Sequence, residues 1–182
     1  MIIANNIEKS FGPQSLFEGV SFLINEGERV GLVGKNGTGK STLFKMILGQ
    51  ESPDSGTLTI PKGYRIGTLE QIICFTQPTV LEECIKVLSP DKQWDHYKAE
   101  IILSGLGFSE QDFHKDPATF SGGYQVRINL CKALLANPNM LLLDEPTNYL
   151  DILSLRWLKE YLNKWPGEMV LITHDQIGRA HV

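Results

Sequence analysis

The stretch Gly34-Lys35-Asn36-Gly37-Thr38-Gly39-Lys40-Ser41 decides the fold of this 182-residue chain. It matches the pattern G-x-x-x-x-G-K-[ST], and it lies between an apolar strand expected over Arg29 to Val33 and a helix expected over Lys40 to Leu48. Glycines let the backbone N–H groups of such a loop wrap around a phosphate, and the following helix adds the partial positive charge of its N-terminus. The pattern therefore predicts an α/β fold with a phosphate-binding loop.

The residue types in this loop predict how a nucleoside triphosphate would be held. Lys40 is expected to bridge the β- and γ-phosphates, and the Ser41 hydroxyl is expected to ligate Mg²⁺. ATP and Mg²⁺ are therefore the predicted cofactors. The predicted phosphate-binding residues are Gly34, Lys35, Asn36, Gly37, Thr38, Gly39, Lys40, Ser41 and Thr42. The loop alone does not choose among kinases, GTPases, motor proteins and cassette ATPases.

Two adjacent carboxylates follow a second apolar strand, in Leu141-Leu142-Leu143-Asp144-Glu145-Pro146. Such a strand places acids at the carboxyl edge of a parallel sheet, where the phosphate-binding loop also lies. We expect Asp144 to hold the Mg²⁺ shell, usually through water, and Glu145 to polarise the water that attacks the γ-phosphate. A solvated turn is the commoner meaning of an Asp-Glu pair, but the strand and the upstream loop favour the catalytic interpretation.

The remaining pattern divides the chain into strands, a helical block and further strands. Strands are expected over Ile2 to Lys9 and Val20 to Ile24, with Thr57 to Ile60 and Tyr64 to Leu69 forming a hairpin around Pro61-Lys62-Gly63. Gly49 is expected to end the first helix. A helical block over Thr79 to Leu135 has start signals at Thr79, Ser109 and Ser121. Strands Met140 to Leu143 and Met169 to Thr173 then flank a helix over Ile152 to Lys164, which predicts a parallel sheet.

Composition excludes several broad classes of protein. With 42% hydrophobic residues, 21% charged residues and a net charge of −4, the chain reads as one ordinary soluble domain, and direct DNA binding is not expected. No apolar run approaches the roughly 20 residues of a membrane-spanning helix, and no signal peptide is expected. Three cysteines without a C-x-x-C pair, Cys74, Cys84 and Cys131, favour a cytoplasmic location.

The stretch Thr119-Phe120-Ser121-Gly122-Gly123-Tyr124-Gln125 resembles the L-S-G-G-Q signature of ATP-binding cassette (ABC) ATPases. Four further positions match the motifs of that family in the right order along almost the whole chain. They are Phe11 at the adenine-stacking position, Gln71 at the Q-loop glutamine, Asn148-Tyr149-Leu150-Asp151 at the D-loop, and His174 at the switch histidine. Each match alone is weak, but all of them in the same order are not explained by coincidence.

This resemblance implies an ABC-type P-loop core with a small antiparallel β subdomain and a helical subdomain inserted over about residues 73–139. The nucleotide-binding domain would span residues 1–176 and be truncated at its C-terminal end. It further implies that Glu145, His174 and Gln71 are catalytic, and that Ser41, Gln71 and Asp144 serve the metal. In the family, the signature faces the γ-phosphate of a second cassette, so Ser121, Gly122, Gly123 and Asp151 are expected to act on a nucleotide shared between two cassettes. Hydrolysis would therefore need a cassette pair.

The run Asp144-Glu145-Pro146-Thr147-Asn148-Tyr149-Leu150-Asp151 resembles the D-E-P-T-N-H-L-D of subfamily F, with Tyr149 in place of histidine. Members of that subfamily carry two cassettes on one chain, lack membrane domains and act on the ribosome. The resemblance implies the first cassette of a translation or antibiotic-protection factor, with the ribosome and a second cassette as partners. The alternative is the ATP-binding subunit of an ABC transporter, which a transmembrane domain encoded alongside would indicate.

The last six residues, Ile177-Gly178-Arg179-Ala180-His181-Val182, form a separate feature. They are what ATC-GGA-AGA-GCA-CAC-GTC encodes, which resembles a common sequencing-library adapter. We therefore expect residues 177–182 to be a non-native tail and exclude them from reasoning about the fold. Resequencing of the locus tests this expectation, because a natural stop codon after Val182 would contradict it.

Overall fold

The computed structural model describes residues 1–69, 73–89 and 95–172 of the chain. The chain divides into two compact units. The first unit contains Met1–Ile66, Asn139–Glu145 and the described residues from Gly167 onward, and the second contains Gly67–Pro138 and Pro146–Pro166. The predicted α/β class is confirmed. The predicted domain boundaries, 1–176 with a helical insert over about 73–139, stay a prediction.

The first unit contains an antiparallel sheet with the strand order β2-β1-β4, made of β1 (Ile2–Phe11), β2 (Gln14–Ile24) and β4 (Ser55–Thr59). A two-residue turn at Gly12 and Pro13 pairs Phe11 with Gln14, and Gly12 has a φ of 58°. This tight turn makes both strands longer than their apolar pattern predicts, because it draws the polar residues Gln14 and Ser15 into the ladder.

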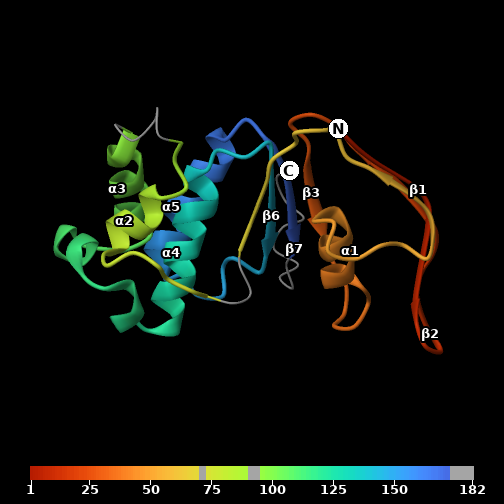
Figure 1. Cartoon of the computed structure of the whole chain (residues 1–182), viewed down its shortest axis with the longest axis horizontal. Helices are drawn as coiled ribbons and strands as arrows, with labels where there is room; N and C mark the ends of the chain where they lie inside the picture. Colours follow the sequence, from red (N-terminus) through yellow and green to blue (C-terminus); the bar gives the residue numbers. More distant parts are fainter. Residues whose placement is uncertain (70–72, 90–94, 173–182) are drawn as a thin grey trace. The chain divides into compact units, whose positions relative to one another are not determined.

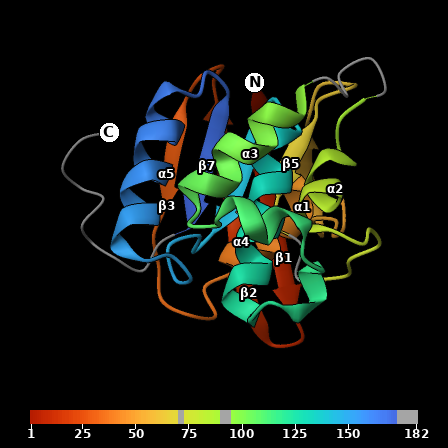
Figure 2. The same cartoon turned by 90° about the vertical axis from the view of Figure 1, so that its left-hand side faces the viewer.

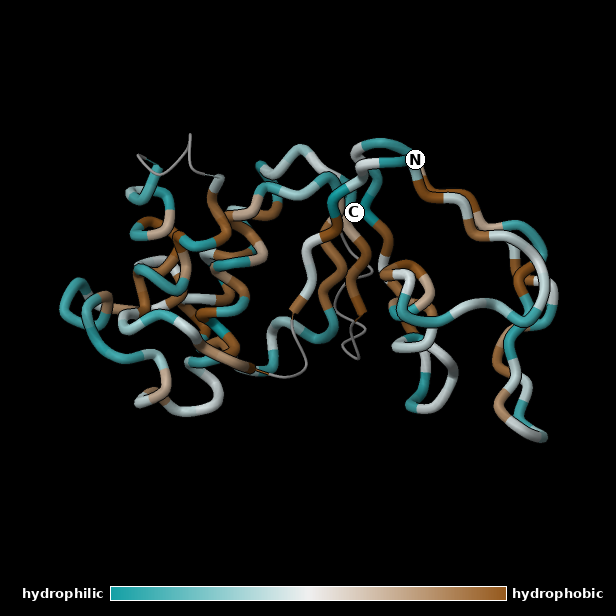
Figure 3. Tube along the Cα trace, in the orientation of Figure 1, coloured by the Kyte–Doolittle hydropathy of each residue, from teal (hydrophilic) through white to brown (hydrophobic). Residues whose placement is uncertain are grey.

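The same unit contains strands of a second sheet, which has the order β3-β7-β6-β5. β3 (Arg29–Leu32), β7 (Glu168–Ile172) and β6 (Met140–Asp144) belong to the first unit, whereas β5 (Ile66–Thr68) crosses the boundary between the units after Ile66. β7 pairs in parallel with both β3 and β6, which confirms the predicted parallel sheet. β6 and β7 are almost entirely buried and are coloured brown along most of their length in Figure 3, as expected for strands covered on both faces.

The hairpin predicted for residues 57–60 and 64–69 is wrong. β4 pairs with β1, with Ala4 opposite Leu58, whereas β5 belongs to the other sheet. The turn at Pro61, where the Tyr64 N–H donates to the Pro61 carbonyl oxygen at 3.1 Å, leads the chain from one sheet to the other. Local turn chemistry predicted a turn correctly but not the partners of its strands, because the edge of β1 offers a long antiparallel ladder.

Helix α1 (Lys40–Ile47) lies between the two sheets of the first unit (Figure 1). It packs Phe44 and Ile47 into a core with residues of both sheets. The buried members of this core are Ile2, Ile24, Phe44, Ile47, Met140, Leu142, Val170 and Ile172. The helix ends at Ile47 with Leu48 as its C-cap, and Gly49 follows with a φ of 70°, as the sequence predicts. Sheet packing therefore holds the N-terminus of α1 in place.

The second unit is helical. Its elements are α2 (Val80–Ile85), α3 (His96–Gly105), the short 3-10 helices η2 (Glu110–His114) and η3 (Pro117–Thr119), α4 (Gly122–Leu135) and α5 (Ile152–Lys164). Helices α2 and α3 pack against α4 (Figure 2). The helix starts predicted at Thr79, Ser109 and Ser121 are all N-caps, although Ser109 caps a 3-10 helix. In residues 1–69, 73–89 and 95–172 no helix is both long and apolar enough to cross a bilayer.

Candidate functional site

The loop between β3 and α1 curls around the Lys40 ammonium. The Lys40 Nζ donates to the carbonyl oxygens of Gly34 at 2.7 Å and Lys35 at 2.8 Å. The Thr38 hydroxyl donates to the same Lys35 carbonyl oxygen at 2.9 Å. Gly37 and Gly39 have φ values of 81° and 95°, which side-chain-bearing residues rarely adopt. The predicted loop residues therefore form one closed turn that opens directly into α1.

This turn has the features of an anion cradle. Helix α1 has no side-chain cap at its N-terminus and no acidic residue in its first turn, so neither competes for its first N–H groups. A Cβ added at Gly39 would lie 2.8 Å from the Phe17 ring atom Cζ, so the backbone approach at this point needs glycine. With the Lys40 charge beside it, the cradle fits a phosphate chain.

The acidic pair stands at the carboxyl end of β6, close to where it was predicted. Asp144, the last residue of β6, is exposed, while the four residues before it are buried. The Glu145 N–H donates to the Ile172 carbonyl oxygen of β7 at 3.0 Å, and Glu145 has a φ of 45°. A glutamate in this left-handed region is uncommon and carries backbone strain, which often accompanies a functional position. The sheet therefore fixes the direction in which both carboxylates leave the strand.

The loop and the acidic pair line one pocket of about 380 Å³ within the first unit. Its lining residues are Phe11, Gln14, Leu16, Asn36, Gly37, Gly39, Lys40, Ser41, Thr42, Asp144 and Glu145. Nine of these were predicted from the sequence. Gln14 and Leu16 were missed, because only the pairing of β2 with β1 brings them to the pocket. There the Gln14 Nε2 donates to the Gly37 carbonyl oxygen at 3.5 Å. Phe11 is half exposed at the rim.

The donor set fits Mg²⁺ better than a metal held by protein ligands alone. Among the described residues no group of three or more His, Cys, Asp or Glu side chains could hold a metal ion. The pocket does bring together the Ser41 hydroxyl and the Asp144 carboxylate. Mg²⁺ is commonly held by one or two protein oxygens together with substrate phosphates and water. The positions of Ser41 and Asp144 are therefore compatible with their predicted role as Mg²⁺ ligands. The third predicted metal residue, Gln71, lies outside the described residues.

The signature residues lie in the second unit. Ser121 is the N-cap of α4 and makes no side-chain cap hydrogen bond, and Gly122 is the first helical residue. No acidic residue lies in the first turn of α4, as in α1. The two residues that depart from the family pattern, Phe120 and Tyr124, pack with Phe108 at ring-centroid distances of 5.1 to 5.9 Å. The two departures thus form an aromatic cluster with Phe108, while Ser121 and Gly122 are exposed.

Asp151 is exposed, and its carboxylate has two partners within the second unit. It caps α5 by accepting from the Ser154 N–H at 2.9 Å, and its other oxygen pairs with the Arg127 guanidinium at 3.0 Å. The hydrogen bond from Ser154, with help from Arg127, lowers the pKa of Asp151 to about 2. Arg127 also donates to the carbonyl oxygens of Tyr149 and Leu106, each at 2.8 Å. Arg127 was not predicted from the sequence. The one sequence feature that could have indicated it is a charged residue within the apolar helix that follows the signature.

Two predicted catalytic residues, Gln71 and His174, lie outside the described residues, as does the expected tail over 177–182. The structure thus brings the phosphate loop, Phe11 and the acidic pair into one pocket, and it places Ser121, Gly122, Gly123 and Asp151 in the helical unit.

Comparison with known proteins agrees with this arrangement. The family model described as "ABC transporter" matches residues 17–148. The energy-dependent translational throttle protein EttA of Escherichia coli K12 is 40% identical over 175 residues, which cover 94% of this chain and 32% of that protein. The probable ATP-binding protein YheS of the same strain is 31% identical over 97% of this chain and 32% of its own length. The chain therefore spans about a third of the length of these relatives.

Solved structures with a similar fold agree with the family match. The structure of an ATP-binding subunit of an ABC transporter matches with a TM-score of 0.84 and 25% identity, over 98% of this chain and 81% of that one. A dimeric ATP-binding cassette in a post-hydrolysis state, bound to ADP and Pi, matches with a TM-score of 0.76 and 25% identity, over 96% of this chain and 88% of that one. Both likenesses cover nearly the whole chain.

Proposed function

Because the chain belongs to the ATP-binding cassette family, we propose that it is the first cassette of a subfamily F protein that hydrolyses ATP when paired with a second cassette. The observation that carries the ATPase part is the single pocket that unites the lysine of the phosphate loop with the two carboxylates after β6. The 40% identity to a translational throttle protein supports the subfamily and a role on the ribosome.

In the proposed reaction each side chain of the pocket has one task. Phe11 stacks on the adenine, while the loop amides and Lys40 hold the β- and γ-phosphates. Ser41 and Asp144 would hold Mg²⁺, which would neutralise charge that develops on the phosphates. Glu145 orients and polarises the attacking water, with Gln71 and His174 as the further catalytic residues. Because catalysis here is positioning and electrostatics, the rigid sheet edge that carries Asp144 and Glu145 is the central requirement.

The second cassette would supply the missing half of the site. Ser121, Gly122 and Gly123 begin a helix whose first N–H groups are free of side-chain caps, so they suit a γ-phosphate presented by another cassette. A dimeric cassette with ADP and Pi among the similar structures supports pairing as the working state. We place the protein in the cytoplasm, in accord with three free cysteines of which Cys84 and Cys131 are buried.

The ribosomal role is tested by co-sedimentation. The full-length protein with Glu145→Gln is mixed with ribosomes and ATP, and the bound fraction is measured against ADP. We expect binding with ATP that is lost with ADP, since the variant should stay in the ATP-bound closed state. Equal sedimentation with and without ribosomes would reject the ribosomal role while leaving the ATPase role intact.

A transporter subunit is the second candidate. An uncharacterized ABC transporter ATP-binding protein of Bacillus subtilis, YfmM, is 32% identical over 96% of this chain and 42% of its own length. The full open reading frame and its neighbours discriminate the two candidates. A second cassette on the same chain favours subfamily F, and a membrane domain encoded alongside favours the transporter.

A further inference from the structure

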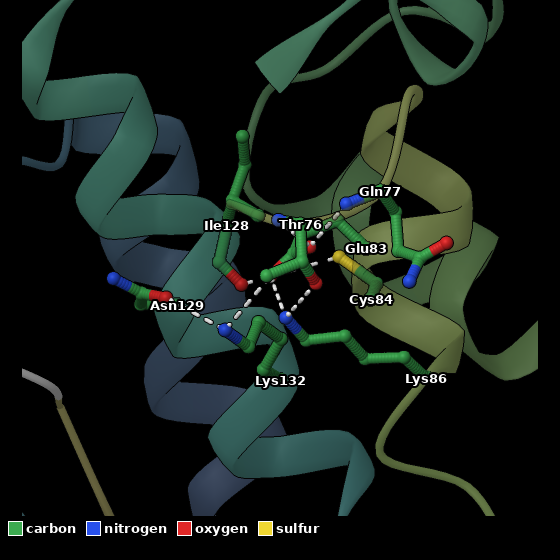
Figure 4. A network of polar contacts seen from close by, with 8 residues as sticks. All are labelled: Thr76, Gln77, Glu83, Cys84, Lys86, Ile128, Asn129 and Lys132. Atoms are coloured by element: carbon green, nitrogen blue, oxygen red, sulfur yellow. Dashed lines mark hydrogen bonds and ion pairs between the residues drawn. The ribbon is translucent and has the colours of Figure 1, made fainter. Parts of the chain in front are cut away.

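The second unit contains a buried acid, Glu83, that the proposed reaction does not use. Glu83 lies on α2 and is fully buried (Figure 4). Its two carboxylate oxygens have different partners. Oε2 accepts the backbone N–H groups of Thr76 at 3.0 Å and Gln77 at 3.2 Å. Oε1 accepts from the Lys132 Nζ of α4 at 3.0 Å and pairs with the Lys86 Nζ at 2.5 Å.

Burial and hydrogen bonding act in opposite directions on Glu83. Burial raises the pKa of its carboxyl, but the hydrogen bonds from Lys86, the Thr76 N–H and Lys132 outweigh this and bring the pKa below its ordinary value. The group is therefore ionised at neutral pH. Lys132 is 7% exposed, and its Nζ also donates to the Asn129 Oδ1 at 3.3 Å. Both charges of this pair are thus withdrawn from water.

Stability alone is a poor reason for such a pair. Moving two charges out of water is costly, and apolar residues of similar volume often serve a core as well or better. What apolar residues cannot do is accept two backbone N–H groups and hold a lysine of another helix at the same time. What needs explaining is therefore that one Glu83 oxygen binds a backbone segment while the other binds a lysine of α4.

The position of this link along the chain suggests its purpose. Thr76 and Gln77 follow Gln71 by five and six residues, and Lys132 belongs to the helix that Ser121 and Gly122 begin. Lys86 adds a second tie, since its Nζ also donates to the Thr76 hydroxyl at 3.1 Å. One carboxylate thus joins the segment after the proposed catalytic glutamine to the helix that bears the signature.

We propose that Glu83 is a positioning residue for ATP hydrolysis, because it fixes the backbone at Thr76 and Gln77 to α4 so that this segment and the signature helix respond to nucleotide together. This inference rests on the proposed function, in which Gln71 and the signature residues act on ATP. Glu83 itself touches neither nucleotide nor metal in this scheme. Its loss should therefore change turnover and leave the affinity of the phosphate pocket in the first unit unchanged.

The central variant is Glu83→Met/Lys132→Met in the full-length protein, which replaces the pair by apolar side chains of similar volume. We expect a melting temperature within about 5 °C of the wild type, since the swap removes both buried charges together. We expect kcat to fall at least about fivefold while KM for ATP stays within about twofold. The matched control is Asp95→Asn/Lys98→Met, which removes the partly exposed pair at 2.7 Å between the N-cap Asp95 and Lys98 of α3 and should change neither value.

Hydrogen exchange supplies a readout that does not depend on turnover. In the wild type the amides of Thr76 and Gln77 should be protected, and ATP should change the exchange of residues 73–79 and 121–135 together. In the double variant both amides should exchange at least about tenfold faster, and ATP should no longer affect residues 121–135. If the double variant does not fold, Glu83→Gln, which keeps the side-chain volume, takes its place.

The outcomes separate the two proposals. A folded variant with wild-type kcat, or with unchanged exchange at Thr76 and Gln77, overturns the positioning role. A full-length wild type that binds ATP without hydrolysing it rejects the proposed function, and the exchange experiment then still decides whether Glu83 joins the two segments. A parallel rise of KM and fall of stability would mark Glu83 as a structural residue only and so would also overturn the proposal.

Discussion

At the scale of single residues, Glu145 combines a strained backbone with a fixed direction. Its φ of 45° and the hydrogen bond of its N–H to Ile172 hold the side chain at the edge of the sheet beside Lys40 and Ser41. We predict that Glu145→Gln lowers kcat for ATP by about 10² to 10⁴-fold, the usual contribution of a general base. ATP affinity should stay unchanged, because the amide has the same size and the phosphates are held by the loop.

The measurement pairs steady-state hydrolysis by the full-length protein with nucleotide binding by calorimetry. Glu18→Gln, a charge removal at an exposed position of β2, serves as the control and should leave both quantities unchanged. Retained turnover in the Glu145 variant would contradict the assigned role of this carboxylate.

Gly39 is the second residue whose local geometry makes a sharp prediction. Gly39→Ala meets a φ of 95° and a clash with the Phe17 ring, whereas Gly63→Ala meets a φ of 78° with open space around the new Cβ. Both changes carry left-handed strain, of order 1 kcal/mol or more. We predict that only Gly39→Ala also weakens ATP binding, by about tenfold or more, since the cradle must shift. Equal ATP affinities for the two variants would show that the cradle tolerates a side chain.

Asp151 connects the structure to acid stability. Its folded pKa of about 2 lies below its ordinary value, so it contributes stability that is present above the unfolded pKa and lost as pH falls through the folded value. We predict that Asp151→Asn flattens the decline of the free energy of unfolding between pH ~4 and pH ~2. Urea unfolding at several pH values measures this. Part of the decline should remain, because the pKa of Asp112 is also lowered to about 2 by Lys115 and Ser109.

At the scale of elements, α4 organises the second unit through Arg127. Its side chain is 7% exposed. It connects α4 to the Leu106 carbonyl oxygen after α3 and to the Tyr149 carbonyl oxygen before α5. We predict that Arg127→Met destabilises the protein by about 2 to 4 kcal/mol, because buried acceptors lose a charged donor. Denaturant unfolding measures the loss. Arg156→Met, at an exposed position of α5, should cost less than about 0.5 kcal/mol; a similar cost for both would deny Arg127 this role.

The elements also show what a single sequence can predict. The phosphate loop, the acidic pair, α4, β6 and β7 were predictable because each has a dense local pattern of glycines, apolar runs or caps. The partner of β4 was not, since strand pairing depends on an edge of β1 that lies some fifty residues earlier in the chain. Gln14, Arg127 and Glu83 were missed for the same reason: polar residues become informative only when distant elements bring their partners to them.

At the scale of the whole molecule, the two sets of proposed functional residues belong to different units. The pocket for the phosphates lies entirely in the first unit, and the signature residues lie entirely in the second. The family resemblance implies that the signature serves a nucleotide held by another cassette. The chain also spans about a third of the length of the relatives EttA and YheS.

We therefore predict that the 182-residue chain, verified as a monomer by light scattering, binds Mg-ATP but turns it over about 10² to 10³-fold more slowly than the full-length protein. The physical reason is that the γ-phosphate then lacks the backbone N–H donors of an opposing helix N-terminus. Removing one such preorganised donor lowers kcat by a factor of about this size. Lys40→Ala in the same chain measures the background from contaminating ATPases, since it removes the loop's own charge. Turnover by the verified monomer at the full-length rate, and well above this background, would show that the first cassette completes its site alone.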